Sequence, residues 1–189
     1  MSTIQEAKAT LRKTAFAARK SARAADPSAP LAARDAFLGA GLLKGAEIVA
    51  GYRPIRTELD PTPLMETLHA AGHRLCVPVI DGAGLPLLFR EWWPGMAMEA
   101  GPFGAEIPAE GAWLDPDLLI APLVAFDRAR WRLGYGGGFY DRTLAKLGAI
   151  KPIAVIGYAF AAQEMPEIPR EPTDQRLDAV VTEREVIGA

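Results

Sequence analysis

Leu118-Leu119-Ile120-Ala121 and Ala154-Val155-Ile156-Gly157 are continuously apolar segments, with no polar residue interrupting either one. A strand that buries one face alternates apolar and polar residues, whereas a strand of a parallel sheet with helices on both faces is apolar throughout. The two segments therefore predict central strands of a sheet that is covered on both sides.

Outward from these segments, apolar runs bounded by turn residues alternate with helical stretches, which is the rhythm of an α/β fold. The candidate strands are Glu47–Tyr52, Arg74–Pro78, Pro86–Glu91, Leu118–Pro122, Ile153–Gly157 and Ala179–Thr182. The candidate helices are residues 1–25, an Ala-rich stretch that ends near Leu38, Pro61–Ala71 and Gly138–Leu147. At 189 residues the chain is close to the length of one domain of about 150 residues. We predict a single three-layer α/β domain over residues 1–189, with a mostly parallel sheet and helices on both faces.

The composition excludes several classes of protein. Half of the residues are hydrophobic and 23% are charged, which is typical of a folded chain rather than a disordered one. Lys and Arg number 21 against 23 Asp and Glu, so nothing in the net charge of -2 favours nucleic acid or an acidic membrane as a partner. Cys76 is the single cysteine, and the longest uncharged apolar run, Ile153–Ala162, is shorter than a membrane span of about 18 residues. We expect a cytoplasmic monomer with no membrane or nucleic-acid partner.

The first 25 residues form a basic, helix-forming segment in which Glu6 is the one acid. On a helix of about 3.6 residues per turn, four cations fall on one face: Lys8, Arg12, Arg19 and Arg23. Like charges four residues apart repel each other, and an anionic partner would relieve that repulsion. For Arg19 and Arg23 we favour simple exposure to solvent.

A glycine-rich run carries the densest chemical signal: Arg132-Leu133-Gly134-Tyr135-Gly136-Gly137-Gly138-Phe139-Tyr140-Asp141-Arg142. Consecutive glycines at a helix start permit positive φ angles and let several N–H groups point at one anion, which the helix dipole also favours. The spacing is not the Walker pattern, and Phe139 stands where the dinucleotide fingerprint has its last glycine. The run predicts a phosphate cradle, and a glycine-rich helix cap without a ligand is the alternative.

This run resembles the signature of the 5-formyltetrahydrofolate cyclo-ligase family, also called 5,10-methenyltetrahydrofolate synthetases. Further segments resemble the family in the same order along nearly the whole chain: Lys8–Arg12, Glu58–Thr62, Gly101–Pro108, Asp117–Asp127, Pro169–Asp174 and Leu177–Glu183. The resemblance implies a fold similar to that of the isomerase and CoA-transferase-like proteins. It also implies an ATP- and Mg²⁺-dependent cyclisation of 5-formyltetrahydrofolate to 5,10-methenyltetrahydrofolate, with release of ADP and phosphate.

The resemblance also implies roles for individual residues. ATP contacts are implied for Lys8, Arg12, Arg132, Leu133, Gly134, Tyr135, Gly136, Gly137, Gly138, Phe139 and Tyr140. Folate contacts are implied for Glu58, Phe103 and Tyr140, and catalytic roles for Arg132 and Tyr140. Asp141 and Asp178 resemble the Mg²⁺ ligands, and Mg²⁺ takes one or two carboxylates together with waters and phosphate oxygens.

One departure from the family lies inside the glycine run. Many members have a lysine at the position of Gly137, so this chain lacks one cation there. We therefore expect Lys8 and Arg12 to carry more of the phosphate binding. For the same reason we expect the basic arm to be retained rather than cleaved as a transit peptide, since cleavage would remove both residues.

Two other functions stay open at this point. A basic arm that binds nucleic acid would give binding that weakens steeply with salt, although the rest of the chain is nearly neutral. A phosphosugar isomerase or acyl-CoA transferase relative would share the fold but would need neither ATP nor the pair of Asp141 and Asp178. Dependence on Mg²⁺ separates that second alternative from the cyclo-ligase.

Overall fold

The computed structural model describes residues 3–188, and for Phe103 it describes the backbone alone. The helices are α1 (Ile4–Ala25), α2 (Ala29–Gly39), α3 (Thr62–Ala70) and α4 (Phe139–Gly148), with short 3-10 helices η1 (Pro102–Gly104) and η2 (Ala161–Gln163). The strands are β1 (Ile48–Ala50), β2 (Arg74–Val79), β3 (Leu88–Trp92), β4 (Met98–Ala100), β5 (Glu106–Pro108), β6 (Leu118–Pro122), β7 (Ala125–Phe126), β8 (Arg132–Leu133), β9 (Ala154–Tyr158), β10 (Ala179–Val181) and β11 (Val186–Ile187).

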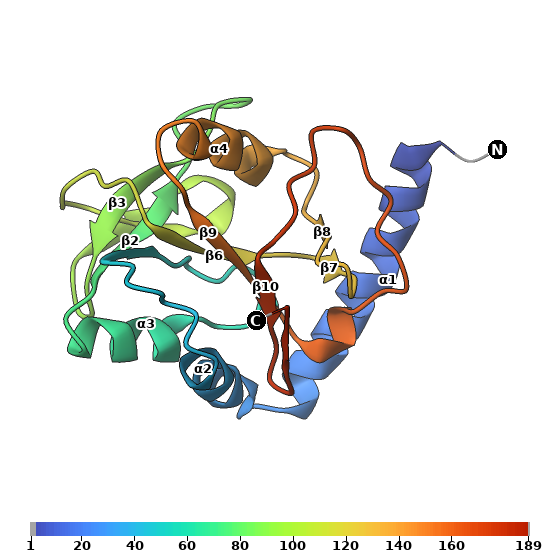
Figure 1. The fold of residues 1–189 in the computed structure, drawn as a ribbon, viewed down its shortest axis with the longest axis horizontal. Helices are drawn as coiled ribbons and strands as arrows, with labels where there is room; N and C mark the ends of the chain where they lie inside the picture. Colours follow the sequence, from blue (N-terminus) through green and yellow to red (C-terminus); the bar gives the residue numbers. More distant parts are fainter. Residues whose placement is uncertain (1–2, 189) are drawn as a thin grey trace.

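A seven-stranded sheet in the order β11-β10-β9-β6-β1-β2-β3 forms the centre of the molecule (Figure 1). Its inner strands β10, β9, β6, β1 and β2 run parallel, while β11 and β3 pair antiparallel at the two edges. In the middle of the sheet Leu119 of β6 is in register with Ala50 on one side and with Val155 on the other. The predicted mostly parallel α/β sheet is confirmed.

Alternate residues of β6 serve two different cores. Leu118 and Ile120 are buried in the apolar cluster under α2 and α3, whereas Leu119 and Ala121 are buried in the cluster that includes α4. Figure 1 shows α4 on one side of the sheet and α2 with α3 on the other. The continuous apolar run of β6 is therefore explained by burial on both faces, and the predicted three layers are confirmed.

Cys76 lies on β2, in register between Ala50 of β1 and Glu91 of β3. Its side chain is completely buried, and this burial raises the pKa of the thiol far above its usual range. The thiolate is the reactive form of cysteine, so this residue is a packing element rather than a nucleophile.

Every predicted strand and helix is present, and the ends of the strands are displaced by at most two residues; α1 begins at Ile4, and the edge strand β11 was not predicted. The sequence does not predict two small hairpins, β4 with β5 and β7 with β8. The first of them lies inside Met96–Trp113, where we expected one irregular loop. Strands of two or three residues contain too little alternation to be recognised from a sequence.

The basic helix α1 packs beside the β7–β8 hairpin and η2 rather than on the main sheet (Figure 1). It begins with a capping box, in which Thr3 and Glu6 exchange side-chain-to-backbone hydrogen bonds. Ala15 in its middle is buried against Val124 and Leu133 in a third, smaller core. Among the helices of residues 3–188, none is long and apolar enough to cross a membrane.

Asp117 joins the amino ends of two central strands. Its Oδ2 atom accepts hydrogen bonds from the backbone N–H groups of Glu47 and Ile48, at 3.1 and 2.9 Å. The ammonium of Lys151 donates to Oδ1 at 2.6 Å. The hydrogen bond from Lys151, with those from the two N–H groups, lowers the pKa of the Asp117 carboxyl.

Replacing Asp117 with alanine is expected to lower the free energy of unfolding at neutral pH by about 1–3 kcal/mol, the usual range for hydrogen bonds to a charged group. Because the pKa is lower in the folded protein, this stabilisation is present above the unfolded value of 3.8 and disappears as the pH falls through the folded value. Urea unfolding of both proteins at neutral pH and well below pH 3.8 measures the effect. A difference of the same size at both pH values would contradict an ionic contribution.

Candidate active site

Glu58 lies in the loop between β1 and α3, with only 3% of its surface exposed. Its own turn holds it: the Glu58 N–H donates to the Ile55 carbonyl at 3.2 Å, and the Ile55 N–H donates back to Glu58 Oε2 at 2.8 Å. The Tyr52 hydroxyl closes the loop by donating to the Leu59 carbonyl. The carboxylate is therefore fixed by backbone contacts at the carboxyl end of β1.

The Tyr135 hydroxyl of the glycine run donates to Glu58 Oε1 at 2.8 Å. Burial raises the pKa of the Glu58 carboxyl, while the Ile55 N–H, the Tyr135 hydroxyl and the charge of Arg19 oppose that shift. Burial and the nearby charge of Glu58 raise the pKa values of Tyr135 and Tyr140. Both tyrosine hydroxyls are therefore protonated at neutral pH, and that of Tyr135 donates to Glu58.

The β7–β8 hairpin places Arg132. Asp127 closes the turn of this hairpin by accepting the Trp131 N–H at 3.0 Å, and Arg132 is in register with Phe126 across the pair. The Arg132 Nη2 atom donates to Asp141 Oδ1 at 2.6 Å. Its guanidinium also lies over the Tyr140 ring, 5.5 Å from the centroid. The structure thus brings together three residues that the sequence assigns to the site.

The glycine run passes from β8 into α4 between two arginines. Gly138 has a left-handed conformation with φ 64° and precedes the first residue of α4. The Arg12 Nε atom donates to the Gly134 carbonyl at 2.9 Å, and the Arg142 Nη2 atom donates to the Gly137 carbonyl at 2.7 Å. The predicted entry of the run into a helix N-terminus is confirmed. Arg142, for which the sequence predicts no role, supplies a cation beside Gly137.

Replacing Gly138 with alanine is expected to lower the free energy of unfolding by about 1–2 kcal/mol, because an L-residue is strained in the left-handed region. The new Cβ would also lie 2.6 Å from Arg142 Nη1 and displace that side chain. Gly134 is the matched control: its φ is not left-handed and its Cβ would meet nothing closer than 3.7 Å. Equal thermal destabilisation of the two variants would contradict this account.

Lys8 of α1 reaches the segment between η2 and β10, which runs beside α1 in Figure 1. Its buried ammonium lies 2.8 Å from Glu171 Oε2 and 2.7 Å from Asp174 Oδ2. An ammonium has three N–H donors, so one remains beyond these two contacts. The next residue, Gln175, donates its N–H to Asp141 Oδ1 at 3.3 Å. This segment therefore connects the cation of α1 to the carboxylate beside the glycine run.

The expectation that Arg19 is exposed to solvent is wrong. Its side chain is 1% exposed, and its Nη1 atom lies 4.0 Å from Glu58 Oε1. Arg23 is at the surface, but its Nη1 atom donates to the Glu58 carbonyl at 3.0 Å. The cationic face of α1 was predictable from the spacing of its residues, whereas the buried carboxylate that faces it comes from a distant loop.

Asp178 and Phe103 are not placed next to the other site residues by any contact within residues 3–188. Asp178 lies just before β10 at the amino end of the sheet, and its Oδ2 atom accepts the Val155 N–H at 2.7 Å. Phe103 has its backbone in η1, and its side chain lies outside the described part of the chain. In residues 3–188 no group of three or more His, Cys, Asp or Glu side chains is placed to hold a metal ion. An Mg²⁺ ion held by one or two carboxylates does not need such a group.

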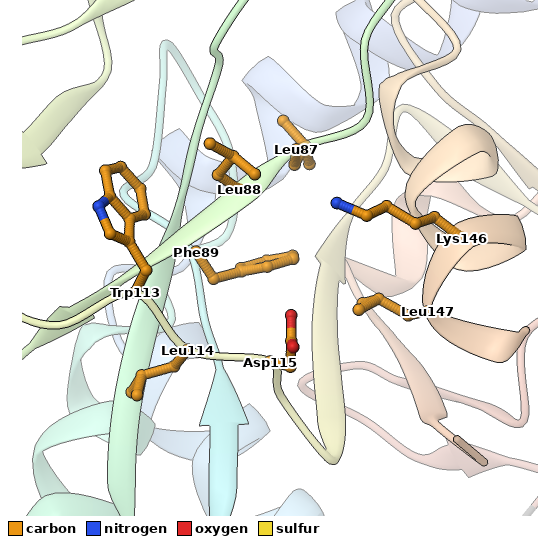
Figure 2. Close-up of a pocket in the computed structure, with 8 residues that line it drawn as sticks. All are labelled: Leu87, Leu88, Phe89, Trp113, Leu114, Asp115, Lys146 and Leu147. Carbon is orange, nitrogen blue, oxygen red and sulfur yellow. The ribbon is translucent and has the colours of Figure 1, made fainter. Parts of the chain in front are cut away.

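A surface hollow of about 210 Å³ lies elsewhere, between α4, β3 and the segment that precedes β6 (Figure 2). Phe89 lies at its centre in that view, with Trp113 on one side and Lys146 and Leu147 of α4 on the other. None of the residues that the sequence assigns to the site lines this hollow. The candidate site is instead the region where Glu58 and the glycine run meet.

The buried carboxylate of Glu58 is hydrogen-bonded to Tyr135 of the glycine run. This run leads into the N-terminus of α4, and Arg12 and Arg142 bind its carbonyls. The fold and this arrangement are those of an α/β enzyme, and a glycine run at a helix N-terminus is suited to an anionic ligand. The chain belongs to the 5-formyltetrahydrofolate cyclo-ligase family, whose model matches residues 4–183. The resemblance identified from the sequence motifs is confirmed.

Curated relatives support the same assignment. Proteins named 5-formyltetrahydrofolate cyclo-ligase from Escherichia coli K12 and Mycolicibacterium smegmatis are 40% identical over 152 residues and 35% identical over 159 residues. These matches cover 75% and 79% of this chain and 80% of each relative. The solved structure of 5,10-methenyltetrahydrofolate synthetase from Aquifex aeolicus has a TM-score of 0.74 at 28% identity, covering 95% of this chain and 91% of that one. A synthetase from Mycoplasma pneumoniae shares the fold at 23% identity with a TM-score of 0.70, covering 94% of this chain and 99% of that one.

Proposed function

We propose that this chain converts 5-formyltetrahydrofolate to 5,10-methenyltetrahydrofolate, with ATP and Mg²⁺, and that residues 1–189 act as a single domain. The observation that carries the proposal is the hydrogen bond from Tyr135 to Glu58. It links the loop suited to phosphates to the carboxylate suited to the folate ring. The names of the family and of its relatives supply the substrate and the product.

The reaction explains why a phosphate site and a folate site must adjoin. The N5-formyl group is amide-like, so its carbon is a weak electrophile and its oxygen a poor leaving group. In the proposed mechanism the formyl oxygen attacks the γ-phosphorus of ATP, and the bond from that phosphorus to ADP breaks. N10 then attacks the activated carbon and loses its proton, and the oxygen leaves as phosphate. Positioning and electrostatic stabilisation supply most of the rate enhancement in such a scheme.

The residues around Glu58 serve the folate end. A carboxylate accepts hydrogen bonds from the N–H groups of a pterin ring, and the two oxygens of Glu58 offer about four lone-pair positions, of which Ile55 and Tyr135 use two. The Tyr140 hydroxyl is protonated at neutral pH and donates to an oxygen of the substrate or of the phosphate. Arg132, fixed by Asp141, stabilises negative charge on the transferring phosphoryl group.

The glycine run, Lys8 and Arg12 serve the nucleotide end, where the N-terminus of α4 favours anions. Both hydrogen bonds that the described residues donate to Asp141 fall on Oδ1, so Oδ2 is available to a cation. Asp141 therefore fits Mg²⁺ beside the glycine run, whereas the contact that places Asp178 is with the Val155 N–H at the other end of the sheet. Mg²⁺ would neutralise charge on the phosphates and withdraw electrons from the transferring phosphorus.

The test follows the near-ultraviolet absorbance of methenyl-bridged folate in mixtures of protein, 5-formyltetrahydrofolate, ATP and Mg²⁺. A rise that requires both ATP and Mg²⁺ is expected, and it would exclude an isomerase or CoA-transferase activity that needs neither. The Lys8→Met variant should raise KM for ATP by about tenfold, the effect of one lost charge-assisted hydrogen bond. Lys13→Met is the control, since Lys13 is an exposed cation of the same helix. A folded protein that gives no ATP-dependent signal would contradict the proposal.

A further inference from the structure

Arg19 is a buried cation whose hydrogen bonds are incomplete. Its Nε atom donates to Thr57 Oγ1 at 3.1 Å. Neither Nη1 nor Nη2 has a hydrogen-bond partner in the described part of the chain, although both atoms are inaccessible to solvent. Burying a charged group without partners is costly, so a guanidinium in this position requires a reason.

The surroundings of Arg19 supply that reason. Its guanidinium carbon lies 5.2 Å from the centroid of the Phe16 ring and 5.5 Å from that of Tyr135. The carboxylate of Glu58 is 4.0 Å from Nη1, beyond hydrogen-bond distance but close for two buried charges. Because the effective dielectric constant is lower away from water, the attraction between these two charges is much stronger than at a surface. Arg19 therefore contacts the ring of Tyr135 and faces the carboxylate that Tyr135 binds.

We propose that Arg19 is a positioning residue that keeps the buried Glu58 ionised and holds Tyr135 against it, so that the carboxylate is ready to accept hydrogen bonds from the folate. This inference rests on the proposed function. It explains why a single helix carries cations toward both ends of the site: Arg12 meets the glycine run, and Arg19 meets Glu58.

Several charged or titratable groups face Glu58 from the elements packed around it: Arg19, Arg23, Arg56, Tyr52, Tyr135 and Tyr140. Among the cations, Arg19 has the largest effect on the carboxyl, ahead of Arg56. Burial already raises the pKa of Glu58, and without Arg19 the rise would be larger. Since a carboxyl is ionised above its pKa, loss of Arg19 would lower the ionised fraction of Glu58 at the pH values of the acid limb.

The experiment measures kcat/KM for 5-formyltetrahydrofolate across pH in Arg19→Met and Arg19→Gln, with circular dichroism as a check of folding. In both neutral variants the acid limb of the profile should move to higher pH by about one unit. At a pH on that limb, kcat/KM should therefore fall by about tenfold. KM for ATP should stay within about twofold. Arg19→Lys, which keeps the charge, should retain most of the wild-type profile. Lys20→Met removes an exposed cation of the same helix and should leave the limb in place.

A thermodynamic cycle with Glu58→Gln separates positioning from a general structural role, with the Kd for 5-formyltetrahydrofolate as the readout. An amide does not titrate, so adding Arg19→Met to Glu58→Gln should weaken binding by no more than about twofold. The role of Arg19 would be overturned if Arg19→Met weakened folate binding as much in the Glu58→Gln background as in the wild type. It would also be overturned if the acid limb stayed in place in both neutral variants. A wild-type protein without ATP-dependent turnover would instead contradict the proposed function, so the two failures are distinguishable.

Discussion

Glu58→Gln is expected to lower kcat/KM for 5-formyltetrahydrofolate by at least about a hundredfold, because two hydrogen bonds to a charged acceptor contribute about 1.5–3 kcal/mol each. Glutamine has the same shape: its amide oxygen can accept the Ile55 N–H, and its amide nitrogen can donate to the Tyr135 hydroxyl oxygen once that hydroxyl turns. An amide presents one acceptor oxygen and one donor nitrogen, and the donor would face the N–H groups of the pterin. The loss therefore falls on folate recognition rather than on folding.

Steady-state kinetics with each substrate varied in turn checks this prediction. KM for ATP should change by less than about twofold, because Glu58 acts at the other end of the site. Glu66→Gln makes the same chemical change at an exposed position of α3 and serves as the control. If Glu58→Gln raised the KM values of ATP and folate equally, the assignment of this carboxylate to the folate would be wrong.

Arg132→Met is expected to lower kcat on the order of a thousandfold, the scale at which an arginine stabilises a phosphoryl-transfer transition state. The side chain is nearly buried, pairs with Asp141 at 2.6 Å and covers the Tyr140 ring. Methionine retains the apolar packing against that ring but removes the charge. The carboxylate of Asp141 would then lack its buried cation, and the site would lose its electrostatic stabilisation.

Single-turnover measurements at saturating ATP and folate separate this chemical effect from binding. The control is Arg128→Met on the same hairpin loop, where the arginine is exposed and its pairs with Glu164 and Glu185 are worth little. An Arg132→Met enzyme with near-normal kcat and only a raised KM for ATP would show that Arg132 binds the nucleotide without acting on the transferring group.

Patterns within one segment were sufficient to predict most of the fold. The apolar run of β6 predicts burial on both faces, and the spacing of the cations on α1 predicts their common side. The hairpin of β7 and β8 was missed because each strand has two residues, and its closure depends on Asp127, which binds Trp131 and Ile168. Contacts of this kind depend on tertiary structure and produce no periodic pattern of apolar and polar residues in the sequence.

The candidate site was predictable to the same extent. The glycine run and Glu58 could be chosen from residue types and the family resemblance, and Tyr135 joins them. The burial of Arg19 could not be predicted, because it depends on Thr57 and Glu58, which belong to a loop far along the chain. The hydrogen bond between Asp178 and the Val155 N–H could not be predicted either. In a sequence, an aspartate before a strand looks the same whether it binds a metal ion or the neighbouring strand.

Cys76, the single thiol, is enclosed on β2 between β1 and the edge strand β3. A thiol-specific reagent added to the native protein therefore reacts only when the sheet itself opens. The labelling rate therefore measures how often this edge of the sheet opens, with no mutation needed. A cysteine introduced at the surface would be the sole site of rapid labelling, because Cys76 does not react in the folded protein. A fluorophore attached near the loop of Tyr135 could then follow ligand binding.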